Sequence, residues 1–203
     1  MRAGLWYPAG WLEPPFRGLG PLPQAETTMM MDAKNASLVM IDYQPRLLPA
    51  IRHGQKLVAR SVTLGRIAAL LGVPVIGTEQ SPDKLGENVP SIRRLCAETV
   101  AKHRFDASEA LRATALAERR QVVLCGCEAH VCVLQTALGL QALGFQVFVV
   151  EDAVGARRQG DRSAALARLS QAGVTLVTLE MAAFEWLGDA DHPRFREVQA
   201  LIK

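Results

Sequence analysis

Cysteine, glutamate and histidine side chains crowd into one eight-residue segment, Cys125–Cys132, which reads CGCEAHVC. The apolar, β-branched run at 121–125 predicts a buried strand. The apolar spacing over 131–143, closed by Gly144, predicts a helix. Cys132 is therefore expected in the first turn of a helix that follows a parallel strand, where unsatisfied backbone N–H groups and the helix dipole favour a thiolate. The segment thus predicts a cysteine nucleophile.

The same segment permits two simpler interpretations. Cys96, Cys125 and Cys127 are expected to be small buried hydrophobic side chains, the usual role of a cysteine in an apolar stretch. Zinc ligation by Cys125, Cys127, His130 and Cys132 is disfavoured, because structural zinc sites usually draw ligand pairs from separate segments. We therefore expect no metal and no other cofactor. Four cysteines without paired spacing give no disulfide framework, which predicts a reducing, cytoplasmic compartment.

Two further titratable residues, Asp42 and Lys102, are expected at the carboxyl ends of strands. This edge of an open α/β sheet binds ligands, so both could meet Cys132 there. A carboxylate can accept the thiol proton and later deliver it to a leaving group, while an ammonium lowers the thiol pKa and holds the carboxylate. Backbone N–H groups in the turn 128–132 could stabilise an oxyanion. His130 is close to Cys132 in the chain, but the sequence does not specify its direction.

Apolar segments that alternate with helical segments predict the elements that must position these side chains. The expected strands are 37–42, 73–78, 99–102, 121–127, 145–151 and 174–178. The expected helices span the region up to Leu71 with a break near His53, then 92–96, 107–118, 131–143, 160–172, 181–187 and 194–202, with a polar loop over 80–92. This alternation predicts right-handed βαβ crossovers. We expect a three-layer α/β/α domain with a six-stranded, mostly parallel, Rossmann-like sheet covered on both faces.

The composition fits one large core and gives no sign of a nucleic-acid or membrane partner. The chain has 203 residues, 49% of them hydrophobic, and 23 basic against 20 acidic residues leave a net charge of +3. No basic block marks a nucleic-acid face, and no apolar run reaches membrane-spanning length.

Residues 1–35 are expected to be an irregular N-terminal extension, followed by one domain over 36–203. Residues 1–30 hold five of the eleven prolines and show neither helical nor strand periodicity. The run Met29–Met31 also fits a natural start, which would make the upstream residues a start-site artefact.

The segment 126–136, which reads GCEAHVCVLQT, resembles the cysteine-bearing motif of the isochorismatase-like cysteine hydrolases. The resemblance covers about residues 36–203. Further matching segments are MIDYQ at 40–44, GTEQ at 77–80, KHRF at 102–105, VEDA at 150–153, Arg162, and GDADHPRF at 188–195. The resemblance implies an isochorismatase-like fold and a hydrolase.

By this resemblance, Asp42 is the general base, Lys102 the supporting cation and Cys132 the nucleophile. The family also has a cis peptide bond before the cysteine, which falls here between Cys127 and Glu128. That bond would aim the backbone N–H groups of Glu128 and Cys132 at an oxyanion. The substrate pocket is expected to include Gln44, Glu79, Phe105 and His130.

Two differences from known members of the family indicate which subgroup the chain resembles. Isochorismatases proper lack the nucleophilic cysteine, so Cys132 disfavours vinyl-ether hydrolysis. Nicotinamidases carry an Asp-x-His metal cluster after the second strand, whereas the segment 78–86 (TEQSPDKLG) contains no histidine. The chain therefore resembles the isochorismatase-domain-containing subgroup, with no metal and with an undefined substrate.

Three functions are consistent with these residues. The first is a cytoplasmic hydrolase that cleaves a C–N bond of a small amide or carbamoyl compound through a thioester. The second is a binding or regulatory module with vestigial chemistry, which the complete set Asp42, Lys102 and Cys132 disfavours. The third is a redox-responsive thiol protein that uses Cys125, Cys127 and Cys132.

The last two expected helices carry an apolar stripe, which either caps the sheet of the monomer or meets a neighbouring subunit. Its members are Phe184, Trp186, Leu187, Phe195, Val198, Leu201 and Ile202. Because proteins of the resembled family usually form oligomers, we expect at least a homodimer.

Overall fold

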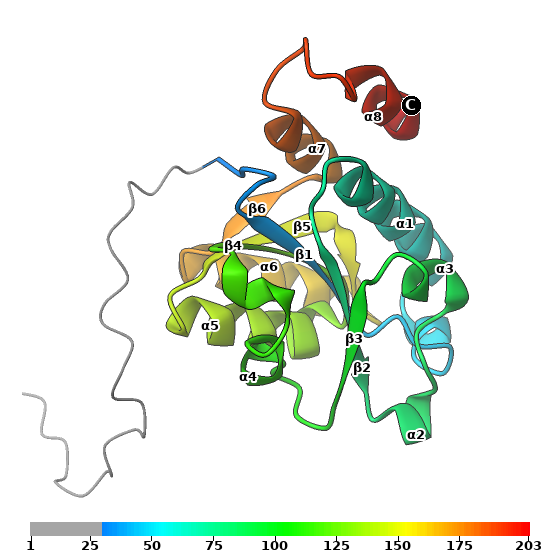
Figure 1. Ribbon diagram of the computed structural model, residues 1–203. Coiled ribbons are helices and arrows are strands. Elements are labelled where there is room, and N and C mark those ends of the chain that lie inside the picture. Colours follow the sequence, from blue (N-terminus) through cyan, green and yellow to red (C-terminus); the bar gives the residue numbers. More distant parts are fainter. Residues whose placement is uncertain (1–29) are drawn as a thin grey trace, which may run out of the picture.

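Six parallel strands form the central sheet, and helices cover both of its faces (Figure 1). The computed structural model describes residues 30–203, except for the side chains of Ala115 and Ala117. The strand order is β3-β2-β1-β4-β5-β6, and each neighbouring pair is parallel. The strands are β1 (Ala36–Ile41), β2 (Val75–Gln80), β3 (Glu98–Lys102), β4 (Gln121–Cys127), β5 (Gln146–Gly155) and β6 (Thr175–Val177). The predicted three-layer α/β/α fold is confirmed.

The central strand β1 explains why both faces need helices. Leu38 and Met40 pack into a core on one face, whereas Val39 and Ile41 pack into a second core on the other. Every residue of β1 is buried, as expected for a parallel strand between two helical layers. The first face is covered by α1 (Gly54–Leu70), α7 (Leu179–Leu187) and α8 (Phe195–Ile202), and the second by α4 (Ser108–Leu111), α5 (Leu134–Ala142) and α6 (Gln159–Gln171).

The single helix expected over 107–118 is instead divided into two short pieces, α4 and the 3₁₀ helix η2 (Ala115–Glu118). Thr114 lies between them. Its hydroxyl donates to the Leu111 carbonyl (2.5 Å) and accepts from the Leu116 N–H (3.3 Å). These side-chain bonds compete with the helical ladder, so the helix prediction was wrong at this point.

The segments that follow β1 and β2 contain short helices. The 3₁₀ helix η1 (Leu48–Ala50) precedes α1, and α1 begins at Gly54, next to the break predicted near His53. The region 80–92, expected to be a polar loop, contains two single-turn helices that each start at a proline. They are α2 (Pro82–Leu85) and α3 (Pro90–Arg93).

Residues 30–35 lie against the domain, although the sequence analysis assigns them to the extension. Met31 is buried, and its N–H donates to Glu185 Oε2 (2.8 Å). The N–H of Asp32 donates to Gln121 Oε1 (2.7 Å). Residues 1–29, and with them the start-site hypothesis, lie outside the described residues. Within 30–203, no helix has the length and apolar character needed to cross a membrane.

Most of the apolar stripe on α7 and α8 caps the sheet of its own subunit. Trp186, Leu187 and Val198 are buried in the core on the α1 face. Phe184 is 42% exposed and packs at a tilt against Phe195, with 6.2 Å between the ring centroids. Phe184 therefore remains at the surface, where a neighbouring subunit could meet it.

Candidate active site

Asp42 and Lys102 form a buried ion pair at the carboxyl edge of the sheet. Asp42 follows β1 with a positive φ of 55°, and Lys102 is the last residue of β3. Because β2 lies between β1 and β3, the two side chains meet across the end of β2. Lys102 Nζ lies 2.8 Å from Asp42 Oδ2, and the two side chains are 3% and 0% exposed. Thr78 Oγ1 donates to the other carboxylate oxygen (2.7 Å), so both oxygens of Asp42 have donors.

Gln80, the last residue of β2, links this ion pair to Cys132. Its Oε1 accepts from Lys102 Nζ (2.7 Å) and lies 4.0 Å from Cys132 Sγ. Its amide nitrogen donates to the His103 carbonyl (2.7 Å), which fixes the orientation of the side chain. Gln80 and Thr78 were not among the site residues predicted from the sequence. The available signal was their position at the carboxyl end of β2, between the strands that carry Asp42 and Lys102.

Cys132 lies in a π-helical turn, η3 (Ala129–Val133), which joins β4 to α5. The peptide bond between Cys127 and Glu128, at the start of this turn, is cis. The helix expected over 131–143 thus begins with a wider π turn rather than with a regular α-helical one. The turn follows the carboxyl end of β4, and it brings the thiol to the Asp42–Lys102 pair.

The backbone just before this turn requires a glycine. Gly126 has a φ of 126°, and a Cβ at this position would lie 2.1 Å from the carbonyl oxygen of Ile41. The register between β4 and β5 also shifts between Leu124 and Gly126. β4 therefore approaches β1 closely at the point from which Asp42 and η3 depart.

The surroundings of Cys132 favour the protonated thiol over the thiolate. Burial is the largest cause and the Asp42 carboxylate the next; together, against the opposing effect of the Lys102 ammonium, they raise the pKa of this thiol to about 12. This direction is opposite to the lowered thiol pKa expected from the sequence, because the effect of burial is larger than that of the ammonium. To act as a nucleophile, such a thiol would have to lose its proton during the attack, and Asp42 is the carboxylate that interacts with it.

The four expected pocket residues divide into two groups. Gln44 and Glu79 are buried and hydrogen-bonded within the protein. Gln44 Nε2 donates to the Gln80 carbonyl, and Gln44 Oε1 accepts from the Gln80 N–H. Glu79 accepts from the Asn88 N–H (2.7 Å). They hold the loop after β2. Phe105 is 50% exposed. His130 presents a buried Nδ1 that has no hydrogen-bond partner among the residues described.

A bidentate ion pair secures the turn that carries Cys132. Arg157 Nε and Nη2 donate to the two oxygens of Glu128 at 3.0 and 2.9 Å. The Glu128 side chain is 8% exposed and that of Arg157 is 62% exposed, so the pair closes the turn from outside. Within residues 30–203, no three His, Cys, Asp or Glu side chains gather into a metal-binding arrangement.

Comparison with known proteins identifies the family. Residues 36–181 match the Isochorismatase domain. The chain belongs to the isochorismatase family. Isochorismatase domain-containing protein 2A of Mus musculus is 37% identical over 172 residues, which cover 84% of each chain. This match confirms the expected isochorismatase-domain-containing subgroup.

Solved structures of this family share the fold. The MAR1 ribonuclease of Caenorhabditis elegans is 36% identical with a TM-score of 0.82, covering 85% of this chain and 92% of that one. YcaC of Escherichia coli, described as an octameric hydrolase of unknown specificity, is 25% identical with a TM-score of 0.75, covering 87% and 97%. The isochorismatase fold is therefore shared with proteins to which different activities are attributed.

Proposed function

We propose that this isochorismatase-family protein is a cysteine hydrolase that cleaves a C–N bond of a small amide or carbamoyl compound through a thioester. The observation that carries the proposal is the buried Asp42–Lys102 pair beside the Cys132 thiol. A fully desolvated carboxylate and ammonium are costly to maintain, so their placement next to a nucleophilic atom favours a chemical role.

In the first half-reaction, Asp42 accepts the thiol proton while Cys132 Sγ attacks the carbonyl carbon. The carbonyl electron pair moves to oxygen, and the N–H groups of Glu128 and Cys132 stabilise this oxyanion. When the intermediate collapses, the C–N bond breaks and Asp42 gives its proton to the leaving nitrogen. The amine departs and a thioester on Cys132 remains.

In the second half-reaction, water attacks the thioester carbonyl and gives a proton to Asp42. The C–S bond then breaks, and the proton returns to the sulfur, which restores the resting thiol. Lys102 balances the charge of the Asp42 carboxylate through their ion pair, and Thr78 orients the carboxylate through its hydrogen bond. His130 is proposed to contact the substrate, which would give a hydrogen-bond partner to a buried Nδ1 that has none among residues 30–203.

RNA cleavage is the second candidate, because the Caenorhabditis elegans relative is called a ribonuclease. A thiol forms thioesters readily with carbonyl carbon, whereas phosphoryl transfer depends on cations placed at the phosphate oxygens. Lys102 is already bound to Asp42 and to Gln80. This engagement favours acyl transfer at the Cys132 site.

The expectations of a cytoplasmic homo-oligomer without a metal remain part of this proposal. The octameric YcaC of Escherichia coli supports assembly, and the exposed Phe184 and Met181 on α7 offer an apolar contact surface. Light scattering at micromolar concentration should give a multiple of the subunit mass. A monomeric mass would contradict this part of the proposal.

The decisive experiment is to trap the thioester. The protein is mixed with a panel of small aliphatic amides and carbamoyl compounds, quenched in acid and digested, and the peptides are analysed by mass spectrometry. We expect an acyl adduct on the Cys132 peptide together with release of ammonia or amine. Cys132→Ala should show neither, while the matched control Cys96→Ala, which removes a half-buried thiol, should retain both.

Other outcomes separate the alternatives. Ammonia release that persists in Cys132→Ala would reject the nucleophile. No adduct with any member of the panel would favour the vestigial binding module, and cleavage of an RNA oligonucleotide that depends on Cys132 would favour the ribonuclease. Disulfide formation after peroxide treatment would favour the redox protein, although Cys125 and Cys127 are fully buried.

A further inference from the structure

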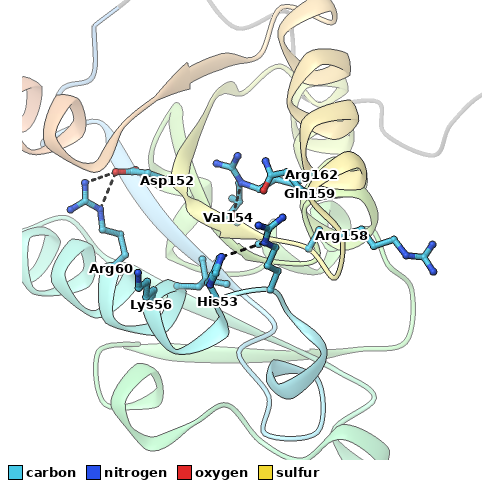
Figure 2. Close-up of a pocket in the computed structure, with 12 residues that line it drawn as sticks. His53, Lys56, Arg60, Asp152, Val154, Arg158, Gln159 and Arg162 are labelled. Carbon is cyan, nitrogen blue, oxygen red and sulfur yellow. Dashed lines mark hydrogen bonds and ion pairs between the residues drawn. The ribbon is translucent and has the colours of Figure 1, made fainter.

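A basic cavity lies apart from the candidate active site. It has a volume of about 290 Å³ and opens between the start of α1, the end of β5 and the start of α6 (Figure 2). Asp42, Lys102 and Cys132 do not line it. The inference drawn from it is independent of the proposed hydrolase chemistry.

The cavity lining carries an excess of positive charge. Its basic members are Arg52, Lys56, Arg60, Arg158 and Arg162, and its one acidic member is Asp152. Both carboxylate oxygens of Asp152 accept hydrogen bonds: Oδ2 accepts from Arg60, and Oδ1 accepts from the Leu179 N–H (2.8 Å). Asp152 therefore balances Arg60, and within residues 30–203 the other four cations have no ion-pair partner.

Arg52, Lys56 and Arg162 line the same cavity, and none of them has a carboxylate partner in residues 30–203. Arg162 is half-buried, and its guanidinium is held by the backbone carbonyls of Val154 (3.1 Å) and Glu151. Arg52 Nε donates to the His53 ring (3.3 Å). Because backbone and imidazole acceptors orient these groups without neutralising them, their charge remains available to a ligand.

The backbone adds to the same field. Both α1 and α6 begin at the cavity, because Lys56 and Gln159 from their first turns line it. The amino termini of two helices longer than three turns therefore direct their partial positive charge toward this space.

We propose that this cavity binds a small phosphate-bearing anion, such as a phosphate monoester or pyrophosphate, through Arg52, Lys56 and Arg162. Guanidinium groups match phosphate oxygens in bidentate geometry, and an ammonium adds a point charge. A compact dianion fits better than an RNA backbone, because the cations converge on one small concavity rather than along a strip.

The chain offers a matched control for charge. Arg158 also lines the rim, but Figure 2 shows its side chain extending away from the cavity, whereas Lys56 and Arg162 lie around it. Replacement of Arg158 removes the same charge from the same surface without removing a proposed ligand contact.

The test is titration calorimetry on the full chain at low ionic strength, with pyrophosphate, inorganic phosphate and a nucleoside monophosphate as probes. We expect saturable binding of at least one probe, at about one per chain. Arg52→Gln and Lys56→Gln, both at exposed positions, should each weaken it about tenfold, and Arg158→Gln should change it less than about twofold. Arg162→Gln should weaken it most; if that variant does not fold, the two exposed variants still decide the result.

Three results would overturn the proposal. The first is the lack of saturable binding of every phosphate probe. The second is an equal loss of affinity in Arg158→Gln and Arg52→Gln, which would indicate a diffuse surface field. The third is a single-stranded RNA that binds more tightly than pyrophosphate and loses affinity in Arg52→Gln and Lys56→Gln, because it would identify an extended phosphodiester as the ligand. Tighter binding of the nucleoside monophosphate than of inorganic phosphate would support the proposal and indicate that the natural ligand is an organic phosphate.

Discussion

Two ion pairs at the carboxyl side of the sheet differ in their surroundings. The side chains of Lys102 and Asp42 are 3% and 0% exposed, whereas those of Arg60 and Asp152 are 39% and 29% exposed. In the buried pair, the protein must replace the water that each charge has lost. In the exposed pair, water and salt still screen the charges. The two pairs therefore differ in how much each charge depends on its protein partner, and this dependence is largest for the enclosed Asp42–Lys102 pair.

Replacing Lys102 by Met should have the largest effect. The aliphatic stem is retained, but buried Asp42 loses its counter-charge, and the pKa of Cys132 loses the ammonium that limits its rise. We expect hydrolysis to fall about 10²–10⁴-fold. The free energy of unfolding, measured by urea titration, should fall by about 3–5 kcal/mol.

The double variant Asp42→Asn/Lys102→Met is the control for this effect. It removes both charges together, so it should recover much of the lost stability without recovering hydrolysis. A single Lys102→Met variant that hydrolyses at the normal rate would remove Lys102 from the reaction.

The effect of burial should also appear at a buried thiol, in the dependence of the free energy of unfolding on alkaline pH. Burial raises the pKa of Cys125 to about 12, so between the ordinary thiol value and pH 12 the folded chain keeps a proton that the unfolded chain has released. The free energy of unfolding should therefore fall as pH rises through this range, by about 1.4 kcal/mol per pH unit for this thiol. Cys125→Ala should lessen the slope by that amount, measured from urea midpoints; identical slopes would contradict the assignment.

Replacing Arg60 by Gln should have a small effect. The pair with Asp152 is partly exposed, and Asp152 keeps its hydrogen bond from the Leu179 N–H. We expect the free energy of unfolding to fall by less than about 1 kcal/mol. A loss as large as that of Lys102→Met would abolish the distinction between the two pairs.

High salt should produce the smallest change in the free energy of unfolding, and it should weaken only the Arg60–Asp152 pair. At about 1 M NaCl the Debye length is about 3 Å, so the remaining effect of Arg60→Gln should vanish. The effect of Lys102→Met should persist, because that pair is enclosed by protein. Urea titrations of both variants at low and high salt check this expectation, and equal salt sensitivity would contradict it.

The fold could be predicted from sequence because parallel strands leave a simple pattern. Continuous apolar runs such as 121–127 correspond to strands buried on both faces, and the observed bounds agree within a few residues. The least accurate end was that of β5, which continues through Glu151 and Asp152 to Gly155. Polar residues ended the predicted strand there, although pairing with β4 resumes beyond its register shift.

The candidate site was only partly accessible from sequence. Topology alone brings Asp42, Lys102 and Cys132 to one edge, because all follow or end parallel strands. The hydrogen-bond partners of side-chain amides could not be predicted from the sequence. Gln44 was expected in the pocket but accepts a hydrogen bond from the Gln80 N–H, whereas the Gln80 side chain accepts one from Lys102. The direction of the pKa shift of the Cys132 thiol was not accessible either, because spacing along the chain indicates a helix terminus but not how deeply the thiol is buried.

The strand order also has a consequence for synthesis. Within residues 30–203, β1 is the first strand, but it lies in the middle of the sheet, and its partner on one side, β4, emerges much later. Until then, one edge of β1 lacks its pairing partner, and such non-local pairing is slow and exposed to aggregation. Cys132 follows β4 directly, so the proposed nucleophile is the last of the three residues Asp42, Lys102 and Cys132 to leave the ribosome. A nascent chain therefore acquires this thiol only when β4, which pairs with β1 beside Asp42, is also available.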